Sequence, residues 1–320
     1  SVKQGVMMVA MYLIGTSFLV APGIRAGKEI WLAYLLGLAV STLLMLMYGR
    51  MSNYMPGKDF CEILESLLGR PLSVIVLAVM TVYFFQLYSY VLRHFDGFVN
   101  SVGLPEAPQV VPALCVGILT VFAVLLGIEV LGHWTEYVLI PIAVFIILTV
   151  VMLGKYMDLS NLQPVFENGF APVIRGTWGL LALPFGETVV FLFVLPPFKE
   201  KGDTCKVFII GQLIASGLIV LSTVSDVLVL GVETVRRLYY PTYSSLAIIE
   251  IGEFIQRLDV VAASIFTVAI FLKSAVLLLA ILKCLGIIFK LDEPRILIIP
   301  VMALAINYGQ MAFPGNFLQY

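Results

Sequence analysis

The sequence has few charged side chains, and neither sign dominates. Aspartate, glutamate, lysine and arginine make up 12% of the 320 residues, and the formal net charge is -1. A protein that binds nucleic acid needs a basic surface or tail, and this sequence provides neither. We therefore expect no nucleic acid partner.

Cysteine and histidine are also scarce. The four cysteines have no CxxC spacing and fall in or beside apolar runs, so we interpret them as small packing residues. The two histidines, His94 and His133, lack cysteine, histidine or carboxylate partners at ligand spacing, so no metal site is expected. The sequence also contains no phosphate-binding loop and no grouping of nucleophile, acid and base. We expect neither an enzyme nor a bound cofactor.

Hydrophobic residues, in contrast, make up 61% of the chain, and the mean hydropathy is +1.04. These values are typical of a polytopic membrane protein, because a helix needs roughly 20 mostly apolar residues to cross the bilayer. Runs of that length recur along the chain. They predict nine spans, at residues 4–24, 30–52, 71–100, 109–126, 133–154, 174–198, 205–230, 258–289 and 294–312.

The spacing of the spans predicts an internal repeat. Residues 1–154 hold five spans, whereas residues 155–320 hold four. We therefore expect a single all-α membrane domain made of two five-helix repeats, with the tenth span absent from this chain. Lysine and arginine are more frequent in the loops on the N-terminal side, which predicts a cytoplasmic N-terminus.

Two predicted spans are interrupted by residues that weaken a helix. In the first span, LIGTSFLVAPG (13–23), the interruption is at Gly15, Thr16 and Ser17. The sixth span, LLALPFGETVVFLFV (180–194), is interrupted by Leu183, Pro184, Phe185, Gly186 and Glu187. Proline removes a backbone donor, and glycine lowers the cost of unwinding. One such break is more often a kink, but paired breaks in corresponding helices indicate a binding site between inverted repeats.

The breaks also predict a type of ligand. An unwound segment leaves amides and carbonyls unpaired within the membrane, and the dipoles of the half-helices point at the gap. We expect amides near Gly15–Ser17 to bind a carboxylate and carbonyls near Leu183–Gly186 to bind an ammonium. An amino acid carries both groups, so the pattern predicts an amino acid ligand.

Glu187 and Lys273 are the charged residues at mid-span depth, where an unpaired charge costs several kcal/mol. Glu187 could carry a proton, pair with a cationic ligand, or be a protonated acid that caps a local backbone donor. Lys273 could pair with Glu187, or its ammonium could replace a bound metal cation. A buried lysine could also titrate and couple binding to a proton.

The third span carries a polar and aromatic face in VYFFQLYSYVLRHFD (82–96). Tyr83 and Gln86 share one side of the helix, one turn apart. We include both as candidates for the lining of the same cavity.

Several segments together resemble one known family. They are GTSFLVAPG (15–23), GIEVLGHWTEY (127–137), MDLSNLQPVFENG (157–169), LPFGE (183–187) and IGEFIQRLD (251–259). The chain is similar to the spore germination permeases, the B subunits of germinant receptors, within the amino acid, polyamine and organocation (APC) transporter superfamily. The resemblance implies a LeuT-like fold of inverted five-helix repeats. It also implies a nutrient ligand, a receptor A subunit and a lipoprotein C subunit as partners, and the spore inner membrane as the location. By the same similarity, the ligand would lie between the two breaks, and Lys273 would lie on a helix that often borders a sodium site.

Three functions remain open from the residues. The chain could be a receptor subunit in which ligand binding shifts a conformational equilibrium. It could be a proton-coupled amino acid transporter that uses the same site, with Glu187 or Lys273 carrying the coupled charge. It could also be a structural subunit or pore component, although broken helices argue against a scaffold. The resemblance favours the receptor subunit.

Overall fold

The structure is a computed structural model that describes residues 1–313 except 54, 56, 104–105, 107, 168, 196–201 and 250–257. All regular secondary structure in these residues is helical. The chain divides into two compact units. Unit 1 comprises Ser1–Gly49, Trp134–Thr188 and Cys205–Ala269, and unit 2 comprises Arg50–His133, Val189–Thr204 and Ile270–Tyr320.

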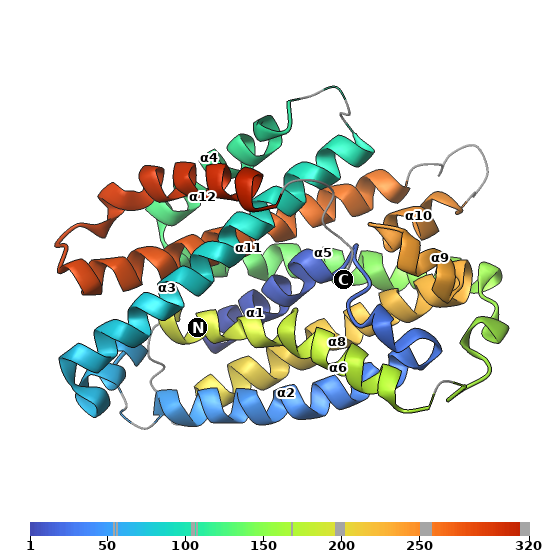
Figure 1. Cartoon of the computed structure of the whole chain (residues 1–320), viewed down its shortest axis with the longest axis horizontal. Coiled ribbons are helices and arrows are strands. Elements are labelled where there is room, and N and C mark those ends of the chain that lie inside the picture. Colours follow the sequence, from blue (N-terminus) through green and yellow to red (C-terminus); the bar gives the residue numbers. More distant parts are fainter. Residues whose placement is uncertain are drawn as a thin grey trace. The chain divides into compact units, whose positions relative to one another are not determined.

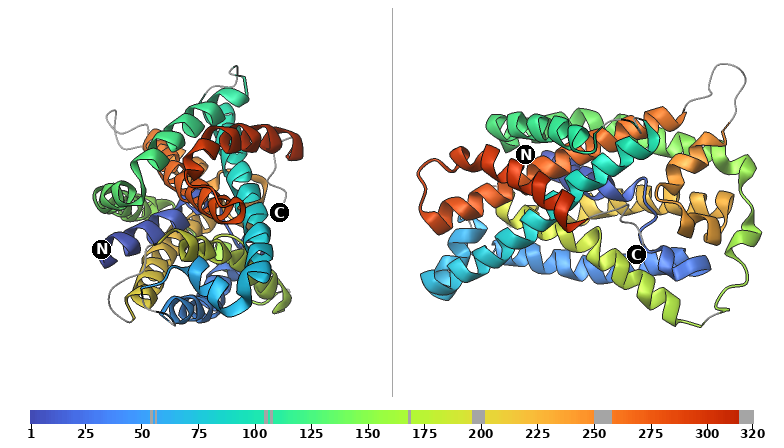
Figure 2. Two further views of the ribbon diagram at one scale, coloured as in Figure 1. Left: turned by 90° about the vertical axis from the view of Figure 1, so that its left-hand side faces the viewer. Right: turned by 45° about the horizontal axis from the view of Figure 1, so that its top comes forward.

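Unit 1 contains two helices that are interrupted, α1 before η1 and α6 before η4, together with several longer and shorter helices (Figures 1 and 2). Its elements are α1 (Val2–Ser17), η1 (Ile24–Glu29), most of α2 (Ile30–Asn53), most of α5 (Ile128–Leu153), η2 (Gly154–Tyr156), η3 (Leu159–Leu162), α6 (Ala171–Ala182), most of η4 (Phe185–Val189), most of α8 (Asp203–Leu230), α9 (Val232–Arg237) and α10 (Pro241–Ala247).

Unit 2 is built around two long helices. Its elements are α3 (Phe60–Val102), α4 (Val110–Leu126), α7 (Val190–Val194), most of α11 (Leu258–Phe289), η5 (Pro294–Leu297) and α12 (Ile298–Ala312).

Seven helices among the described residues are long and apolar enough to cross a membrane. The sequence predicted nine spans. The difference arises because α1 has 16 residues and α4 has 17. At a rise of about 1.5 Å per residue, α1 is about 24 Å long, whereas the hydrocarbon core is about 30 Å thick. The first predicted span is therefore shortened by the break that follows α1.

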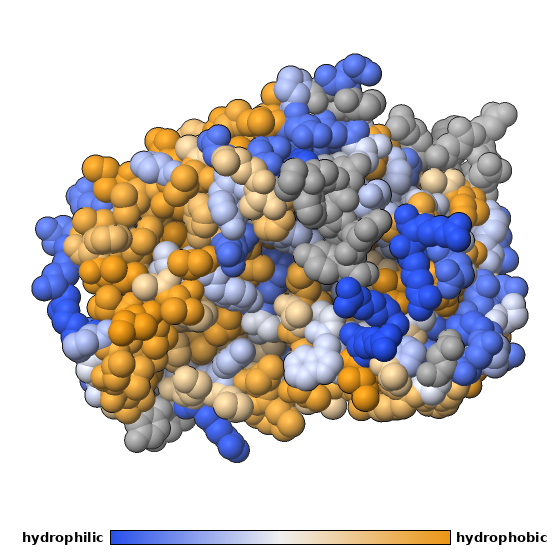
Figure 3. All heavy atoms as spheres, in the orientation of Figure 1, coloured by the Kyte–Doolittle hydropathy of each residue, from blue (hydrophilic) through white to orange (hydrophobic). Residues whose placement is uncertain are grey.

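The outward faces of the long helices are apolar. On α3, Leu72, Ile75, Val79 and Val82 are 55% to 63% exposed and lie on successive turns of one face. Figure 3 shows mainly hydrophobic residues over the left part of this face, where the first half of α3 runs in Figure 1. A face of this kind is stable against lipid rather than water. The all-helical membrane fold predicted from composition is confirmed.

Close helix packing in both units depends on glycine. In unit 1, a Cβ atom added to Gly211 of α8 would lie 2.8 Å from the Cβ of Val9 on α1. In unit 2, a Cβ atom at Gly309 of α12 would lie 2.9 Å from the carbonyl oxygen of Ser89 on α3. Small residues at these positions let the backbones approach, as in membrane helix pairs generally.

The first part of α3, before Gly69, is a short helix that precedes the third predicted span at 71–100. It begins at Phe60 with a reciprocal capping box, in which Asp59 accepts from the Glu62 amide at 2.9 Å and Glu62 accepts from the Asp59 amide. Gly69 has φ of 72° and separates this helix from the rest of α3. Asp59 also pairs with Lys283 of α11, with Nζ and Oδ2 2.9 Å apart.

The Asp59 carboxylate is expected to make stability depend on pH. Burial raises the pKa of Asp59, but the Glu62 amide and the Lys283 ammonium outweigh it and hold the pKa below its usual value of about 3.9. The stabilisation is therefore present above about pH 4 and is lost as the pH falls through the lowered pKa. Asp59→Asn keeps a capping side chain but removes the charge, so we expect it to melt at a lower temperature than wild type at pH 7 and at nearly the same temperature at the acid end.

Melting curves of the detergent-solubilised protein from pH 7 to pH 3 would measure this difference. Glu65→Gln is the matched control, because Glu65 is half exposed and lies 3.9 Å from Arg70. A constant difference between Asp59→Asn and wild type across the whole pH range would contradict the prediction.

Candidate functional site

The first break follows α1. The helix continues through Gly15, Thr16 and Ser17 and ends at Phe18, whose amide donates to the Ile14 carbonyl at 2.9 Å. The chain is non-helical from residue 19 to Gly23, which has φ of 84°, and then enters η1. Gly15, Thr16 and Ser17 are buried. The break therefore begins just after the residues that predicted it.

This position changes the expected charge preference of the break. Amides at Gly15–Ser17 lie inside the helix and are bonded to carbonyls one turn earlier, so they are not free to bind a carboxylate. The groups without helical partners at this end are carbonyls, and the helix dipole is negative there. The prediction that this segment binds a carboxylate through its amides is wrong. Its carbonyl end favours a cation or an ammonium.

The second break lies where it was predicted. α6 ends at Ala182, Leu183 is extended, and the Leu183–Pro184 peptide bond is cis. The chain then forms η4 over Phe185–Val189. Phe185 and Glu187 are buried in η4. The end of α6, like that of α1, presents carbonyls, which agrees with the ammonium preference expected for this break.

Gly186 is required by the geometry of the second break. A Cβ atom at this position would lie 2.5 Å from the carbonyl oxygen of Leu181, closer than real Cβ contacts. Thr188, also fully buried, donates to the Phe185 carbonyl at 2.7 Å. Glycine and threonine therefore close η4 tightly against the last turn of α6.

Both breaks belong to unit 1, and α6 packs on the chain that follows the first break. A Cβ atom at Gly23 would lie 3.0 Å from Cγ of Leu180, and one at Gly176 would lie 2.6 Å from the Cβ of Ala26. These contacts attach the start of η1 to the helix that leads into the second break. A shift at one break is therefore transmitted directly to the segment beside the other.

A buried polar cluster lies at the end of α1. Thr242 of α10 lies 2.8 Å from the carbonyl oxygen of Phe18 and 2.5 Å from Oδ2 of Asp226 on α8, and its hydroxyl is 3.4 Å from that of Ser222. Asp226 is 1% exposed. A threonine hydroxyl has one proton and can donate to one acceptor at a time. Thr242 can satisfy both contacts at once if the Asp226 carboxyl carries a proton and donates to the hydroxyl.

Asp226 was not among the candidates from the sequence. It lies in LSTVSDVLVL (221–230), near the end of a predicted span, so its position did not mark it as a mid-membrane charge. The available signal was the accompanying series of hydroxyl residues, since Ser222, Thr223 and Ser225 are all buried. Thr223 also bonds to the Tyr34 hydroxyl of α2 at 3.2 Å.

The remaining predicted site residues fall in unit 2. Tyr83 is half-buried and Gln86 is exposed, both on α3. Lys273 of α11 is fully buried. Their assignment to the cavity stays a prediction. Of the segment IGEFIQRLD (251–259), only Leu258 and Asp259 are among the described residues. Asn168 of the 157–169 motif also lies outside the described residues.

Comparisons with known proteins agree with this architecture. The family model for spore germination proteins matches residues 1–310. Spore germination protein KB of Bacillus subtilis is 29% identical over 326 residues, which cover 100% of this chain and 86% of that protein. Spore germination protein A2 of the same organism is 24% identical over 264 residues, which cover 80% of this chain and 71% of that protein.

A solved transporter has a similar fold. Mhp1 is a nucleobase-cation-symport-1 family transporter, determined in a closed conformation with bromovinylhydantoin bound. The match has a TM-score of 0.63 at 11% identity and covers 97% of this chain and 72% of that one. The fold is thus that of a LeuT-like transporter, as the broken helices predicted. Because the family model extends over nearly its whole length, the chain belongs to the spore germination protein family.

Proposed function

We propose that this chain is the nutrient-binding membrane subunit of a spore germinant receptor. Its ligand, a small amino acid, would bind in unit 1 between the end of α1 and the α6–η4 break. The observation that carries the proposal is that two interrupted helices, far apart in the sequence, meet in one compact unit and are lined by buried polar groups. A receptor A subunit and a lipoprotein C subunit would be its partners in the spore inner membrane, with the N-terminus in the cytoplasm.

The distribution of helices supports a site between repeats. α1 and α2 of residues 1–154 and α6 and α8 of residues 155–320 belong to unit 1. α3 and α4, and most of α11 with α12, belong to unit 2. Helices in corresponding positions of the two halves therefore share a unit, as two inverted repeats would produce. On this basis we propose that the first repeat ends at residue 154 and that the second begins at residue 155.

The two carbonyl ends support recognition of an ammonium group. α1 and α6 both end at the breaks, so two negative dipole ends belong to the same site. Thr16 and Ser17, in the last turn of α1, would add hydroxyl groups to the site. Glu187 is buried beside Gly186 and would either carry a proton or face the ammonium. Tyr83, Gln86 and Lys273 belong to unit 2, and their part in ligand binding stays a prediction from the sequence.

A proton-coupled amino acid transporter is the second candidate. It is favoured by the fold shared with Mhp1, which is a transporter. The two functions use the same site and differ in whether the ligand is released on the other side of the membrane. Buried Glu187 and Asp226 would be the proton carriers in this case.

Binding and uptake measured on the same preparation would separate these functions. We expect at least one of the twenty labelled L-amino acids to bind saturably to the purified full-length chain and not to accumulate in proteoliposomes, even under an imposed proton gradient. Accumulation that collapses with the gradient would identify a transporter. Absence of saturable binding for every amino acid would contradict the amino acid ligand.

A further inference from the structure

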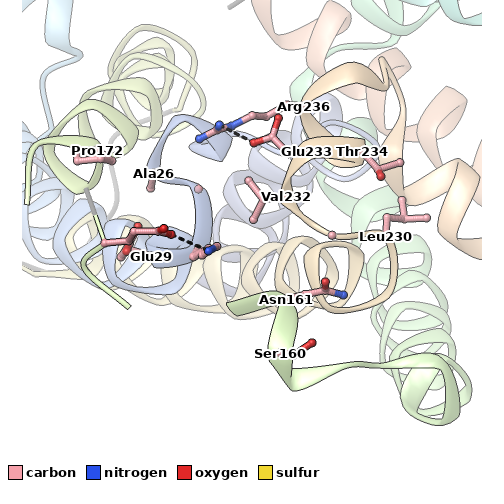
Figure 4. Close-up of a pocket in the computed structure, with 14 residues that line it drawn as sticks. Ala26, Glu29, Ser160, Asn161, Pro172, Leu230, Val232, Glu233, Thr234 and Arg236 are labelled. Atoms are coloured by element: carbon pink, nitrogen blue, oxygen red, sulfur yellow. Dashed lines mark hydrogen bonds and ion pairs between the residues drawn. The ribbon is translucent and has the colours of Figure 1, made fainter. Parts of the chain in front are cut away.

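Unit 1 contains a polar cavity whose lining includes no residue of 15–18 or 183–187, and we call it the η1 pocket. It has a volume of about 490 Å³ and is formed by residues 26–29 around η1, by Ser160, Asn161, Glu167 and Pro172, and by residues 230–234 and Arg236 (Figure 4). This volume is in the range of small-molecule sites. Its charged residues have both signs, with Lys28 and Arg236 opposed by Glu29, Glu167 and Glu233.

Glu29 provides a buried negative group in the η1 pocket. It is 5% exposed, and its Oε1 accepts a hydrogen bond from the Phe166 amide at 2.7 Å. Among the described residues, no hydrogen bond reaches Oε2. A buried carboxylate with an available oxygen is a strong acceptor for an ammonium, because burial weakens screening by water.

Arg236 provides the positive group. Its Nη1 lies 3.1 Å from Oε1 of Glu233, as the dashed line in Figure 4 shows. Its Nη2 lies over η1, 3.0 Å from the position of a Cβ atom at Gly27. Gly27 has φ of 66° and ψ of −127°, a conformation that other residues rarely adopt. The absence of a side chain at Gly27 leaves one nitrogen of the guanidinium for a second acceptor.

The existing ion pairs are weak enough to be exchanged. Lys28 and Glu167 are 2.9 Å apart, but their side chains are 31% and 56% exposed. Arg236 and Glu233 are 43% and 75% exposed. Exposed pairs of this kind contribute little to stability, because water screens their charges. A ligand carboxylate can therefore replace Glu167 on Lys28, or join Glu233 on Arg236, at little cost.

We propose that the η1 pocket is a binding site for an α-amino acid, with the ligand ammonium on Glu29 and the ligand carboxylate on Arg236 and Lys28. A zwitterion carries the two charges that these side chains complement, and the described residues contain no group of three or more His, Cys, Asp or Glu side chains that could hold a metal ion. The inference does not depend on the site at the breaks, and its test separates the two.

The test is equilibrium binding of the labelled L-amino acid panel to the purified full-length chain. The tightest-binding amino acid is then compared with its amide, which lacks the carboxylate, and with its deaminated acid, which lacks the ammonium. Glu29→Gln keeps an oxygen for the Phe166 amide and removes the charge, so its fold is expected to be retained. Arg236→Met is the second variant, and Glu65→Gln in unit 2 is the control.

We expect Glu29→Gln and Arg236→Met each to bind one amino acid fewer per chain than the wild type does. Glu29→Gln should weaken binding of the amino acid to the η1 pocket at least tenfold, and it should leave the affinity for the deaminated acid unchanged. Arg236→Met should also weaken binding of the amino acid to the η1 pocket at least tenfold, and it should leave the affinity for the amide unchanged. Unchanged stoichiometry and affinity in both variants, or no binding by any panel member, would overturn the proposal. If Gly186→Leu still binds one amino acid, and adding Glu29→Gln abolishes that binding, the result supports the η1 pocket. If Gly186→Leu binds as the wild type does, the result excludes the site at the breaks and not the η1 pocket.

Discussion

Replacing Gly186 with leucine is expected to abolish amino acid binding at the breaks while the protein still inserts into the membrane. The first side-chain atom would lie 2.5 Å from the Leu181 carbonyl oxygen, so η4 must move away from α6. Overpacking of this kind costs about 1 to 3 kcal/mol. Since 1.4 kcal/mol is about a factor of ten in affinity, a cost of this size in the bound state corresponds to a loss of about 5-fold to 100-fold, even before the leucine fills ligand space.

Gly179→Leu is the matched control for this experiment. Gly179 lies on α6, two turns before Gly186, and nothing lies within 4 Å of a Cβ atom placed there. The control should bind with wild-type affinity and melt at a similar temperature. Wild-type affinity in Gly186→Leu would show that the ligand does not bind at the second break.

Replacing Thr242 with valine is expected to destabilise unit 1. The change keeps the shape of the side chain but removes the hydroxyl that contacts both the Phe18 carbonyl and Asp226. A buried polar group without a partner costs about 1 to 3 kcal/mol, so the loss of two contacts should cost roughly 2 to 5 kcal/mol. The melting temperature should fall clearly, and ligand binding should weaken because the end of α1 is no longer fixed.

Two variants on the same helix control for this effect. Thr242→Ser retains the hydroxyl and should restore most of the stability. Ser244→Ala removes a hydroxyl whose contact, to the Tyr240 carbonyl, is 3.4 Å long and only partly buried, so it should change little. Equal stability of Thr242→Val and wild type would show that the cluster at Asp226 does not hold α1 in place.

Much of the fold could be predicted from the sequence because membrane helices follow from hydrophobic length alone. Spans such as 205–230 and 258–289 agree with α8 and α11 within a few residues. The short helix that forms the first part of α3 could also be predicted, because Phe60, Ile63 and Leu64 are apolar and spaced at helical intervals. The exact end of α1 was not, because glycine, threonine and serine are tolerated in a helix that is packed on all sides.

The candidate site was predicted in part. Proline and glycine at 184 and 186 identified the second break, since their backbone effects are local. The carbonyl end presented by α1 depends on where the helix stops, which is a tertiary property. Asp226 was missed for a similar reason. Its partner Thr242 is 16 residues away, and the other contact of Thr242, the Phe18 carbonyl, is 224 residues from Thr242, so the sequence gives no sign of either contact.

The most direct test of the site is photoaffinity labelling of the full-length chain with a diazirine analogue of its tightest-binding amino acid, followed by mass spectrometric mapping of the labelled residues. The site proposed at the breaks predicts labels at Thr16–Phe18 and Leu183–Glu187 that disappear with excess unlabelled amino acid and in Gly186→Leu. Competable labels confined to the η1 pocket or to other segments, with none at either break, would contradict it.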